Sequence, residues 1–73
     1  MLGAELKKAR EQAGKTQETL AFDAGLSRPY ISQLERGLKS PTPDTLFLLC
    51  DTLDISVQEL VGRVEVARNQ RRR

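Results

Sequence analysis

The sequence contains no histidine and no tryptophan, and its only cysteine is Cys50. Without histidine the chain lacks the usual general base and the commonest metal ligand, which excludes Ser/His/Asp triads and Cys/His zinc sites. One cysteine excludes an internal disulfide, and no pair of carboxylates is marked as sharing a cleft. We therefore expect no enzymatic activity, no metal and no cofactor. Cys50 lies in the apolar run LFLLCDTL, which favours a buried core residue over the alternative of a reactive thiol.

Long hydrophobic runs are also absent. No apolar stretch approaches the roughly 20 residues that span a bilayer, and the start of the chain, MLGAELKKAREQ, is charged where a signal peptide is apolar. The 73 residues include only three prolines, one tyrosine and two phenylalanines, and 30% of them are charged. This composition is typical of one soluble, mostly helical domain. We expect a cytoplasmic protein that has no membrane segment.

The formal net charge of +2 is unevenly distributed. Residues 1–62 hold seven lysines and arginines against nine acidic residues, whereas residues 63–73 hold five arginines against Glu65 alone. We therefore expect a domain over residues 1–62, followed by a basic C-terminal tail over residues 63–73 that is partly helical and then disordered. Bulk charge is weak evidence for nucleic-acid binding, so the functional argument depends on the positions of individual residues.

The spacing of apolar residues predicts five short helices and no strand. Leucine and alanine recur at helical intervals over residues 2–13, which indicates a first helix there. Thr16 and Ser27 are N-cap candidates for a second and a third helix. Gly25 and Gly37 are expected to end these two helices, because glycine accepts the backbone conformation that follows a helix.

Two further helices follow a loop that is rich in proline and serine. Thr42 is expected to cap the fourth helix, whose first residue is Pro43, and Ser56 and Glu59 form the capping box S-x-x-E of the fifth. Phe22, on the second predicted helix, is expected to be a packing residue. The sequence thus predicts an all-α fold, a compact five-helix bundle. Its last two helices are expected to bury Leu46, Leu49, Cys50, Leu53, Val57, Leu60 and Val61.

The most informative segment is TQETLAFDAGLSRPYISQLERG, residues 16–37. It resembles the helix-turn-helix of the phage-repressor and Cro family, also called the XRE family, and the resemblance extends over roughly residues 4–61. The positions that carry it are Gln17, Leu20, Ala21, Gly25, Leu26, Ser27, Ile31, Ser32, Leu34, Glu35 and Gly37. The resemblance implies the lambda-repressor-like fold, with the second and third predicted helices as the helix-turn-helix. It also implies a transcription regulator that binds specific double-stranded DNA.

The third predicted helix, over about residues 27–36, is the expected recognition helix in the major groove. We interpret its outward positions as base-reading residues: Arg28, Pro29, Ser32 and Gln33. Arginine can bond guanine O6 and N7, and glutamine can bond adenine N6 and N7, so Arg28 and Gln33 are the strongest candidates. Pro29 offers only an apolar contact. The alternative is that Arg28 and Gln33 belong to a solvated helix face.

Contacts with the DNA backbone are expected around this helix. The resemblance implies that Gln17 touches a phosphate and braces Arg28. Tyr30 could equally be a packed ring or a hydroxyl that bonds a phosphate. The resemblance also implies an ion pair between Arg10 and Glu35, for which the alternative is two unrelated surface charges. The full set expected to contact phosphates or to position the helices is Thr16, Gln17, Ser27, Tyr30, Arg36, Lys39 and Ser40.

An excess of apolar residues predicts a homodimer. The run from Leu46 to Cys50 has five consecutive apolar residues, which is more than one face of a helix can bury. A dimer also suits a two-fold symmetric operator. The alternative to the dimer is a monomer with a fraying tail. The alternative function is a protein-interaction module, such as an antitoxin or adaptor, with the same fold. The expected dimer interface contains Phe47, Leu48, Val57, Leu60, Val61 and Val64.

Overall fold

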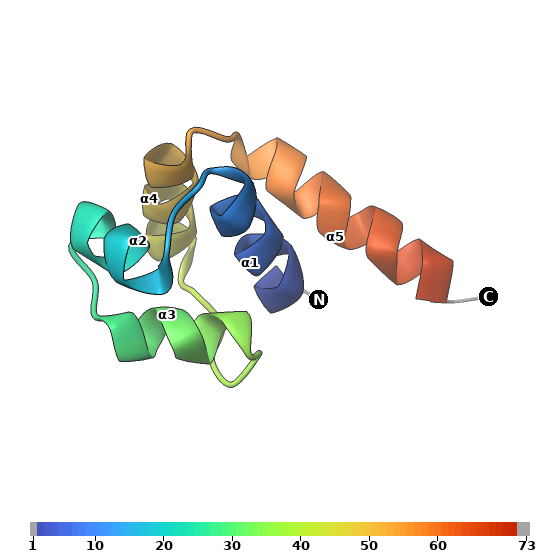
Figure 1. Cartoon of the computed structure of the whole chain (residues 1–73). Coiled ribbons are helices and arrows are strands. Elements are labelled where there is room, and N and C mark those ends of the chain that lie inside the picture. The colour runs from blue at the N-terminus through green and yellow to red at the C-terminus, as the bar shows by residue number, and fades with distance from the viewer. Residues whose placement is uncertain (1, 72–73) are drawn as a thin grey trace.

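The computed structural model describes residues 2–71, and within that range it consists of five α-helices and no strand. Figure 1 shows α4 beside α2, α3 along the lower side, and α5 extending away from the other four helices. The predicted all-α fold with five helices is confirmed. The helices are α1 (Leu2–Gln12), α2 (Gln17–Ala24), α3 (Arg28–Glu35), α4 (Pro43–Leu53) and α5 (Val57–Arg71).

Side-chain caps fix the starts of four helices. The hydroxyl groups of Thr16, Ser27, Thr42 and Ser56 each accept a hydrogen bond, of 3.0 to 3.2 Å, from the backbone N–H three residues later. Each cap satisfies one of the amides that the first turn of a helix leaves unpaired. The four predicted caps are therefore confirmed. The carboxylate of Glu59 pairs forward along α5, with its Oε1 3.7 Å from the Arg63 guanidinium.

One hydrophobic core unites the five helices. Each helix contributes an aliphatic side chain that is at most 1% exposed, namely Leu6, Leu20, Ile31, Leu49 and Leu60. Cys50 belongs to the same cluster, and burial raises the pKa of its thiol. A raised pKa reduces the reactive thiolate fraction, so Cys50 is a packing residue, as the sequence predicts.

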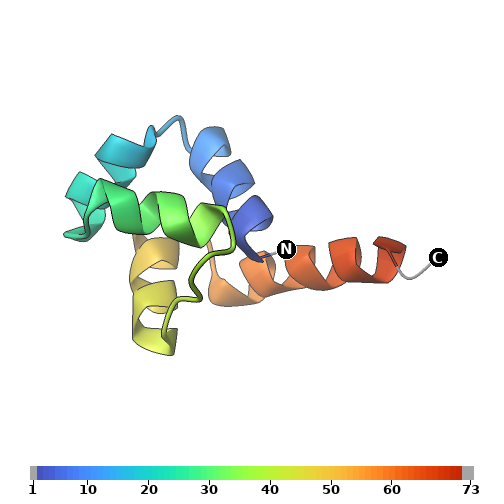
Figure 2. The same ribbon diagram turned by 90° about the horizontal axis from the view of Figure 1, so that it is seen from below.

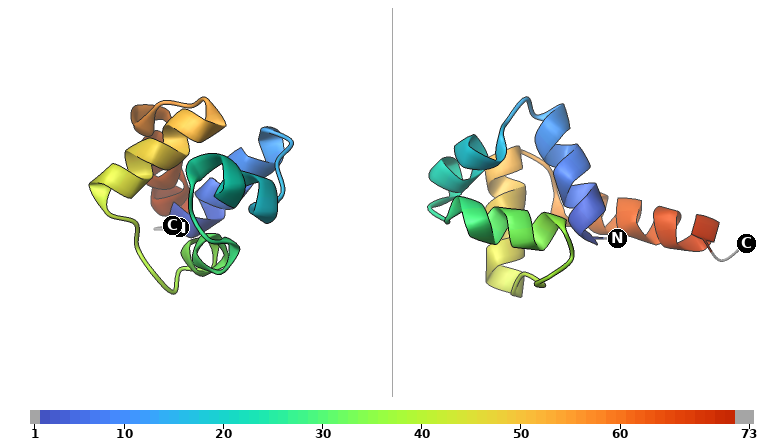
Figure 3. Two further views of the ribbon diagram at one scale, coloured as in Figure 1. Left: turned by 90° about the vertical axis from the view of Figure 1, so that its left-hand side faces the viewer. Right: turned by 60° about the horizontal axis from the view of Figure 1, so that its bottom comes forward.

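A tight turn joins α2 to α3. Gly25 has a φ of 69°, which glycine adopts without the steric strain of a Cβ atom. The N–H of Leu26 donates to the carbonyl oxygen of Ala21 at 2.8 Å, which closes the end of α2. Figure 2, seen from below, shows α3 in front of the other helices, and the left view of Figure 3 looks along it at the edge of the bundle. The turn therefore leaves one side of α3 open.

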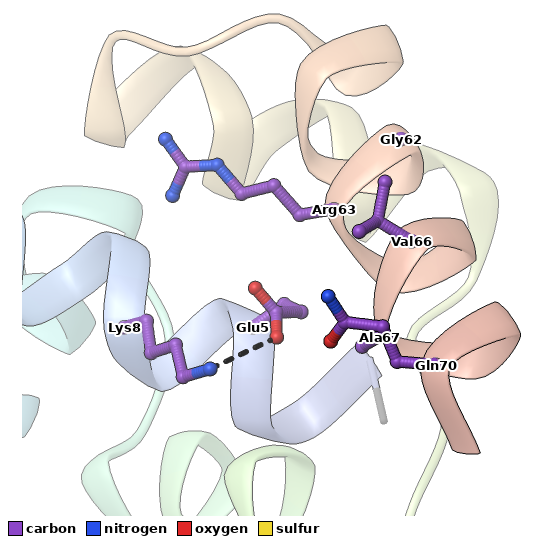
Figure 4. A pocket seen from close by; sticks show the side chains of 7 residues that line it. All are labelled: Glu5, Lys8, Gly62, Arg63, Val66, Ala67 and Gln70. Atoms are coloured by element: carbon purple, nitrogen blue, oxygen red, sulfur yellow. Dashed lines mark hydrogen bonds and ion pairs between the residues drawn. The ribbon is translucent and has the colours of Figure 1, made fainter. Parts of the chain in front are cut away.

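The fifth helix extends into the predicted C-terminal tail. It continues to Arg71, so residues 63–71 of that tail, which was expected to be partly helical, are helical, whereas residues 72–73 lie outside the described range. Arg63 ties α5 to α1, because its guanidinium donates to the Gln12 side chain at 2.9 Å. Arginine and glutamine also favour helices. A groove of about 510 Å³ lies between the two helices. It is lined by Glu5, Lys8, Gly62, Arg63, Val66, Ala67 and Gln70 (Figure 4).

Three apolar residues lie elsewhere than predicted. Val61, expected to be buried, is 44% exposed, because it lies about 100° around α5 from the buried Leu60. Leu60 is 0% exposed, because its whole side chain is buried in the core of the chain. Its assignment to a dimer interface is therefore wrong. Phe22 is 86% exposed, so the expectation that it packs is also wrong. At about 100° per residue, Phe22 lies roughly 200° around α2 from the buried Leu20, which places it on the opposite face.

Gly3 sets the approach of α1 to the end of α3. A Cβ atom on Gly3 would lie 2.4 Å from the carbonyl oxygen of Leu34 and 2.6 Å from that of Glu35. Both oxygens belong to the backbone, so they cannot rotate away as a flexible side chain would. Only glycine at this position therefore allows the observed contact between the start of α1 and the end of α3.

We expect Gly3→Ala to lower the free energy of unfolding by about 1 to 3 kcal/mol, because the added atom forces α1 and α3 apart. The matched control is Gly62→Ala in α5, where a Cβ atom meets nothing within 4 Å. That substitution should raise stability by up to about 1 kcal/mol through helix propensity. Urea unfolding followed by circular dichroism measures both variants. Equal stabilisation by the two substitutions would contradict the close contact at Gly3.

Candidate nucleic-acid interface

The outer side of α3 carries the four residues predicted to read bases. Ile31 anchors the inner side of the helix and is 0% exposed. Arg28 and Pro29 are exposed, and Ser32 and Gln33 are half-buried. Because Ser32 follows Arg28 by four residues, and Gln33 follows Pro29 by four, the four positions form one strip along the helix. An isolated α-helix of this diameter fits the major groove of B-DNA.

Capping residues position α2 and α3. Thr16 accepts the Thr19 N–H at 3.0 Å, and Ser27 accepts the Tyr30 N–H at 3.2 Å. The ring of Tyr30 is half-buried and packs against the core, which agrees with the packed ring that was one of its two expected roles. Thr16 and Ser27 are themselves exposed, so their hydroxyls lie at the surface where the two helices begin.

Arg10 and Glu35 form a buried ion pair that joins α1 to α3. The Nε and Nη2 atoms of Arg10 donate to the two oxygens of Glu35 at 2.7 and 3.2 Å, and Nη1 donates to the Lys15 carbonyl at 2.8 Å. Both residues are less than a tenth exposed. The bond to Glu35 raises the pKa of Arg10 more than burial lowers it. The pairing implied by the family resemblance is therefore present, and it holds the end of α3.

Gln17 bonds a different partner from the one predicted. Its Nε2 atom donates to Oε1 of Glu35 at 3.0 Å, so the side chain braces the end of α3 instead of Arg28 at its start. Gln17 bonds Glu35 because the buried carboxylate can accept several hydrogen bonds, and each of them stabilises its negative charge. Together with Arg10, Gln17 therefore links α1, α2 and α3 through Glu35.

Lys15 makes two contributions to this region that the sequence did not predict. Its backbone carbonyl accepts from Arg10, and its side-chain Nζ pairs with Asp23 on α2 at 2.6 Å. A lysine and an aspartate eight residues apart in the sequence predict the ion pair between Lys15 and Asp23 only when the helix boundaries are already known. The carbonyl contact has no side-chain signature in the sequence.

The remaining predicted phosphate contacts follow α3. Arg36, Lys39 and Ser40 are all exposed, and none of them belongs to a helix. The N–H groups of Leu38 and Lys39 donate to the Gln33 carbonyl at 2.9 and 3.4 Å, which folds this segment back on the end of α3. Arg36 and Lys39 therefore lie close in sequence and structure to the end of α3.

Exposed apolar side chains occur on both α4 and α5. Phe47 is 56% exposed, Leu48 is 40% exposed and Val61 is 44% exposed; we call these three residues the α4–α5 surface. Val57 and Val64, also predicted to face a partner, are half-buried. The run of apolar residues in α4 thus exceeds what the core takes up, as the sequence indicates.

Within residues 2–71, no helix has the length and apolar character needed to cross a membrane. In the same part of the chain, no three histidine, cysteine, aspartate or glutamate residues are grouped as they would be around a metal ion.

Comparison with known proteins agrees with this geometry. The helix-turn-helix family model matches residues 6–60, which include α2, α3 and the turn between them. The HTH-type transcriptional regulator y4dJ of Sinorhizobium fredii, named as uncharacterized, is 39% identical over 61 residues, or 84% of this chain and 79% of that protein. The chain spans about half the length of several further regulators that it matches.

Solved structures of similar sequence share the fold. SinR, a master regulator of biofilm formation solved in complex with DNA, superposes with a TM-score of 0.79 at 34% identity, covering 84% of this chain and 98% of that one. The restriction-modification controller protein C.AhdI of Aeromonas hydrophila gives a TM-score of 0.78 at 39% identity, covering 81% and 89%. These proteins are regulators and not enzymes. The chain belongs to the helix-turn-helix family of DNA-binding transcriptional regulators, of the phage-repressor or XRE type.

Proposed function

We propose that this protein is a sequence-specific transcription regulator, of the repressor or controller type, that places α3 in the major groove of a two-fold symmetric operator. The observation that carries the proposal is the arrangement of α3, which is anchored through Ile31 and Glu35 and presents Arg28, Ser32 and Gln33 outward. SinR, a similar protein solved in complex with DNA, supports DNA binding. Such a regulator acts in the cytoplasm, where its operator is.

Specific recognition falls to Arg28 and Gln33. Five residues separate them, so they are about 7.5 Å apart along the helix and offset by roughly 140° around it. At that separation they read different base pairs. Pro29 and Ser32 lie between them on the strip and add an apolar contact and a hydroxyl. Two groups of residues hold the helices against the DNA backbone. The group on the α2 side is Gln17, Thr16, Ser27 and Tyr30, and the group at the other end of α3 is Arg36, Lys39 and Ser40.

We expect Arg28→Ala and Gln33→Ala each to weaken operator binding by roughly 1 to 3 kcal/mol and to relax the preference at particular base pairs. The measurement is fluorescence anisotropy on the operator and on a panel of single base-pair changes. Lys39→Ala is the matched control for a phosphate contact. It should weaken binding to all sequences about equally and flatten the salt dependence. If Arg28→Ala left both affinity and preference unchanged, α3 would not read bases through that residue.

The proposal includes a homodimer built on the α4–α5 surface, flanked by Val57 and Val64. Phe47, Leu48 and Val61 are exposed apolar side chains on two helices that pack together. Exposed apolar groups that lie together mark contact sites more often than scattered ones do. A single DNA-binding module buries only about 600 to 1,000 Å² of its surface on DNA, so a second half-site, about 34 Å away, adds the affinity that a regulator needs.

Salt dependence separates this function from that of an antitoxin or adaptor, which would bind a protein instead. DNA binding releases counterions, so the affinity should fall steeply as the salt concentration rises, by about 0.9 log units per phosphate contact for each tenfold increase. The affinity of an apolar contact with a protein does not fall in this way as the salt concentration rises. An affinity for duplex DNA that is weak and insensitive to salt would contradict the proposed function.

A further inference from the structure

The segment that joins α3 to α4, residues 36–42, carries an exposed leucine. Leu38 is 64% exposed, more than any other leucine that the structure describes. It belongs neither to the hydrophobic core nor to the apolar residues packed against that core. Its neighbours Arg36, Lys39 and Ser40 are proposed to contact DNA, whereas Leu38 has no role in that set. The packing of the chain therefore does not account for a leucine at this position.

Backbone hydrogen bonds hold Leu38 against the end of α3. The N–H of Gly37 donates to the carbonyl oxygen of Leu34 at 3.2 Å. The N–H groups of Leu38 and Lys39 both donate to the carbonyl oxygen of Gln33, at 2.9 and 3.4 Å. The position of Leu38 is therefore tied to that of Gln33, a proposed base reader. Because this backbone is already ordered, a ligand that binds there does not have to order it.

The side chain of Leu38 is turned away from α1. A crevice of about 220 Å³ lies between the start of α1 and residues 36–42, and Gly37 and Lys39 line it whereas Leu38 does not. Figure 1 and the left view of Figure 3 both show this segment as the lowest part of the molecule, below α3. A duplex that receives the outer side of α3 lies on the same side. The exposed leucine is therefore placed at the edge of the proposed DNA interface.

The charges around Leu38 favour a nucleic acid over a protein as its partner. Residues 36–42 contain two cations, Arg36 and Lys39, both exposed, and no acidic residue. The acidic residue that precedes them, Glu35, is buried in an ion pair. A duplex offers matching chemistry, because its phosphates lie beside the carbon atoms of deoxyribose and beside thymine methyl groups in the major groove.

We propose that Leu38 makes an apolar contact with DNA at the edge of the half-site that α3 reads, against deoxyribose carbons or a thymine C5-methyl group. This inference rests on the proposed DNA-binding function and adds one residue to its contacts. A phosphate contact by Arg36 or Lys39 releases a counterion, whereas an apolar contact releases none. The contribution of Leu38 to affinity is therefore independent of the salt concentration, which distinguishes it from its neighbours.

The test is Leu38→Ser, measured by fluorescence anisotropy on the operator duplex at several salt concentrations. Loss of the apolar side chain should lower the affinity about 5- to 10-fold for each half-site. The slope of log affinity against log salt should stay unchanged. Leu38→Met keeps an apolar side chain of similar volume and should retain the affinity. Val66→Ser is the matched control, because it removes an apolar side chain that is 57% exposed on α5. It should leave the affinity unchanged.

A duplex in which deoxyuridine replaces every thymidine distinguishes the two sources of the contact, because it lacks only the C5-methyl groups. If Leu38 contacts a thymine methyl group, the loss of affinity caused by Leu38→Ser should disappear on this duplex. If Leu38 contacts deoxyribose, the same loss should remain. Either result supports an apolar contact, and the comparison assigns it to the base or to the sugar.

Three results would overturn the contact. Equal affinity of Leu38→Ser and the unmodified protein would show that the leucine does not touch DNA, and the proposed function would stand. A flatter salt slope in Leu38→Ser would show that the substitution acts through the neighbouring phosphate contacts. A large loss of stability in urea, with no loss of affinity, would show that Leu38 serves the fold. If the unmodified protein binds no duplex, the proposed function and this contact are both wrong.

Discussion

Glu35→Ala is expected to lower the free energy of unfolding by about 3 to 5 kcal/mol, the largest effect on stability that we expect from one substitution. The reason is that Arg10, 8% exposed, would keep its charge in a buried position without its carboxylate partner. Gln17 would also lose its acceptor, which lies at 3.0 Å in the native protein. Urea unfolding followed by circular dichroism measures the loss.

A double-mutant cycle isolates the interaction between the two charges. The variant Arg10→Ala/Glu35→Ala should lose less stability than the sum of the two single variants, because neither charge is then left unpaired. Asp23→Ala is the control, since it breaks the 2.6 Å pair with Lys15 at a more exposed site. It should cost no more than about 1 kcal/mol. Strictly additive losses for Arg10 and Glu35 would show that the pair contributes no coupling energy.

Phe47→Glu is expected to dissociate the proposed homodimer. A carboxylate in place of a side chain that is 56% exposed costs the folded chain little, but it places a charge on the α4–α5 surface. Sedimentation at micromolar concentration should change from a mass near twice the 8.2 kDa of the chain to that of one chain. Affinity for an operator with two half-sites should fall by about 10² to 10⁴-fold, because the second half-site no longer binds intramolecularly.

Phe22→Glu provides the control for the sedimentation measurement. It makes the same chemical change at a phenylalanine that is 86% exposed on α2, outside the α4–α5 surface. Its mass should stay at twice that of the chain. The dimer would be contradicted if the unmodified protein were a monomer that still bound a single site tightly. It would also be contradicted if the Phe47→Glu and Phe22→Glu variants had the same mass.

Local features of the sequence were sufficient to predict the helices. An N-cap hydroxyl and a glycine at a turn act within four residues, so Thr16, Ser27 and Gly25 specify the limits of α2 and α3 without reference to the rest of the chain. The outward strip of α3 followed from helical spacing in the same way. The face of Phe22 was also predictable from spacing, since it lies opposite Leu20 on α2.

Features that depend on tertiary distances were not predictable from spacing. The requirement for glycine at Gly3 arises because two carbonyls at the end of α3 approach the start of α1. Gln17 had two potential partners, Arg28 and Glu35, and only the relative placement of the helices decides between them. The extent of α5 depends on its contact with α1, including the bond from Arg63, which composition alone does not reveal.

Selection of bound sequences from a pool of random duplexes tests the central claim most directly. The account predicts that one site is enriched, with two half-sites in inverted orientation whose centres lie about 34 Å, or one helical turn, apart. It also predicts that repeating the selection with Arg28→Ala relaxes the preference at the same position in both half-sites. Failure to enrich any site from the pool would contradict sequence-specific DNA binding and would favour a protein-interaction module that has the same fold.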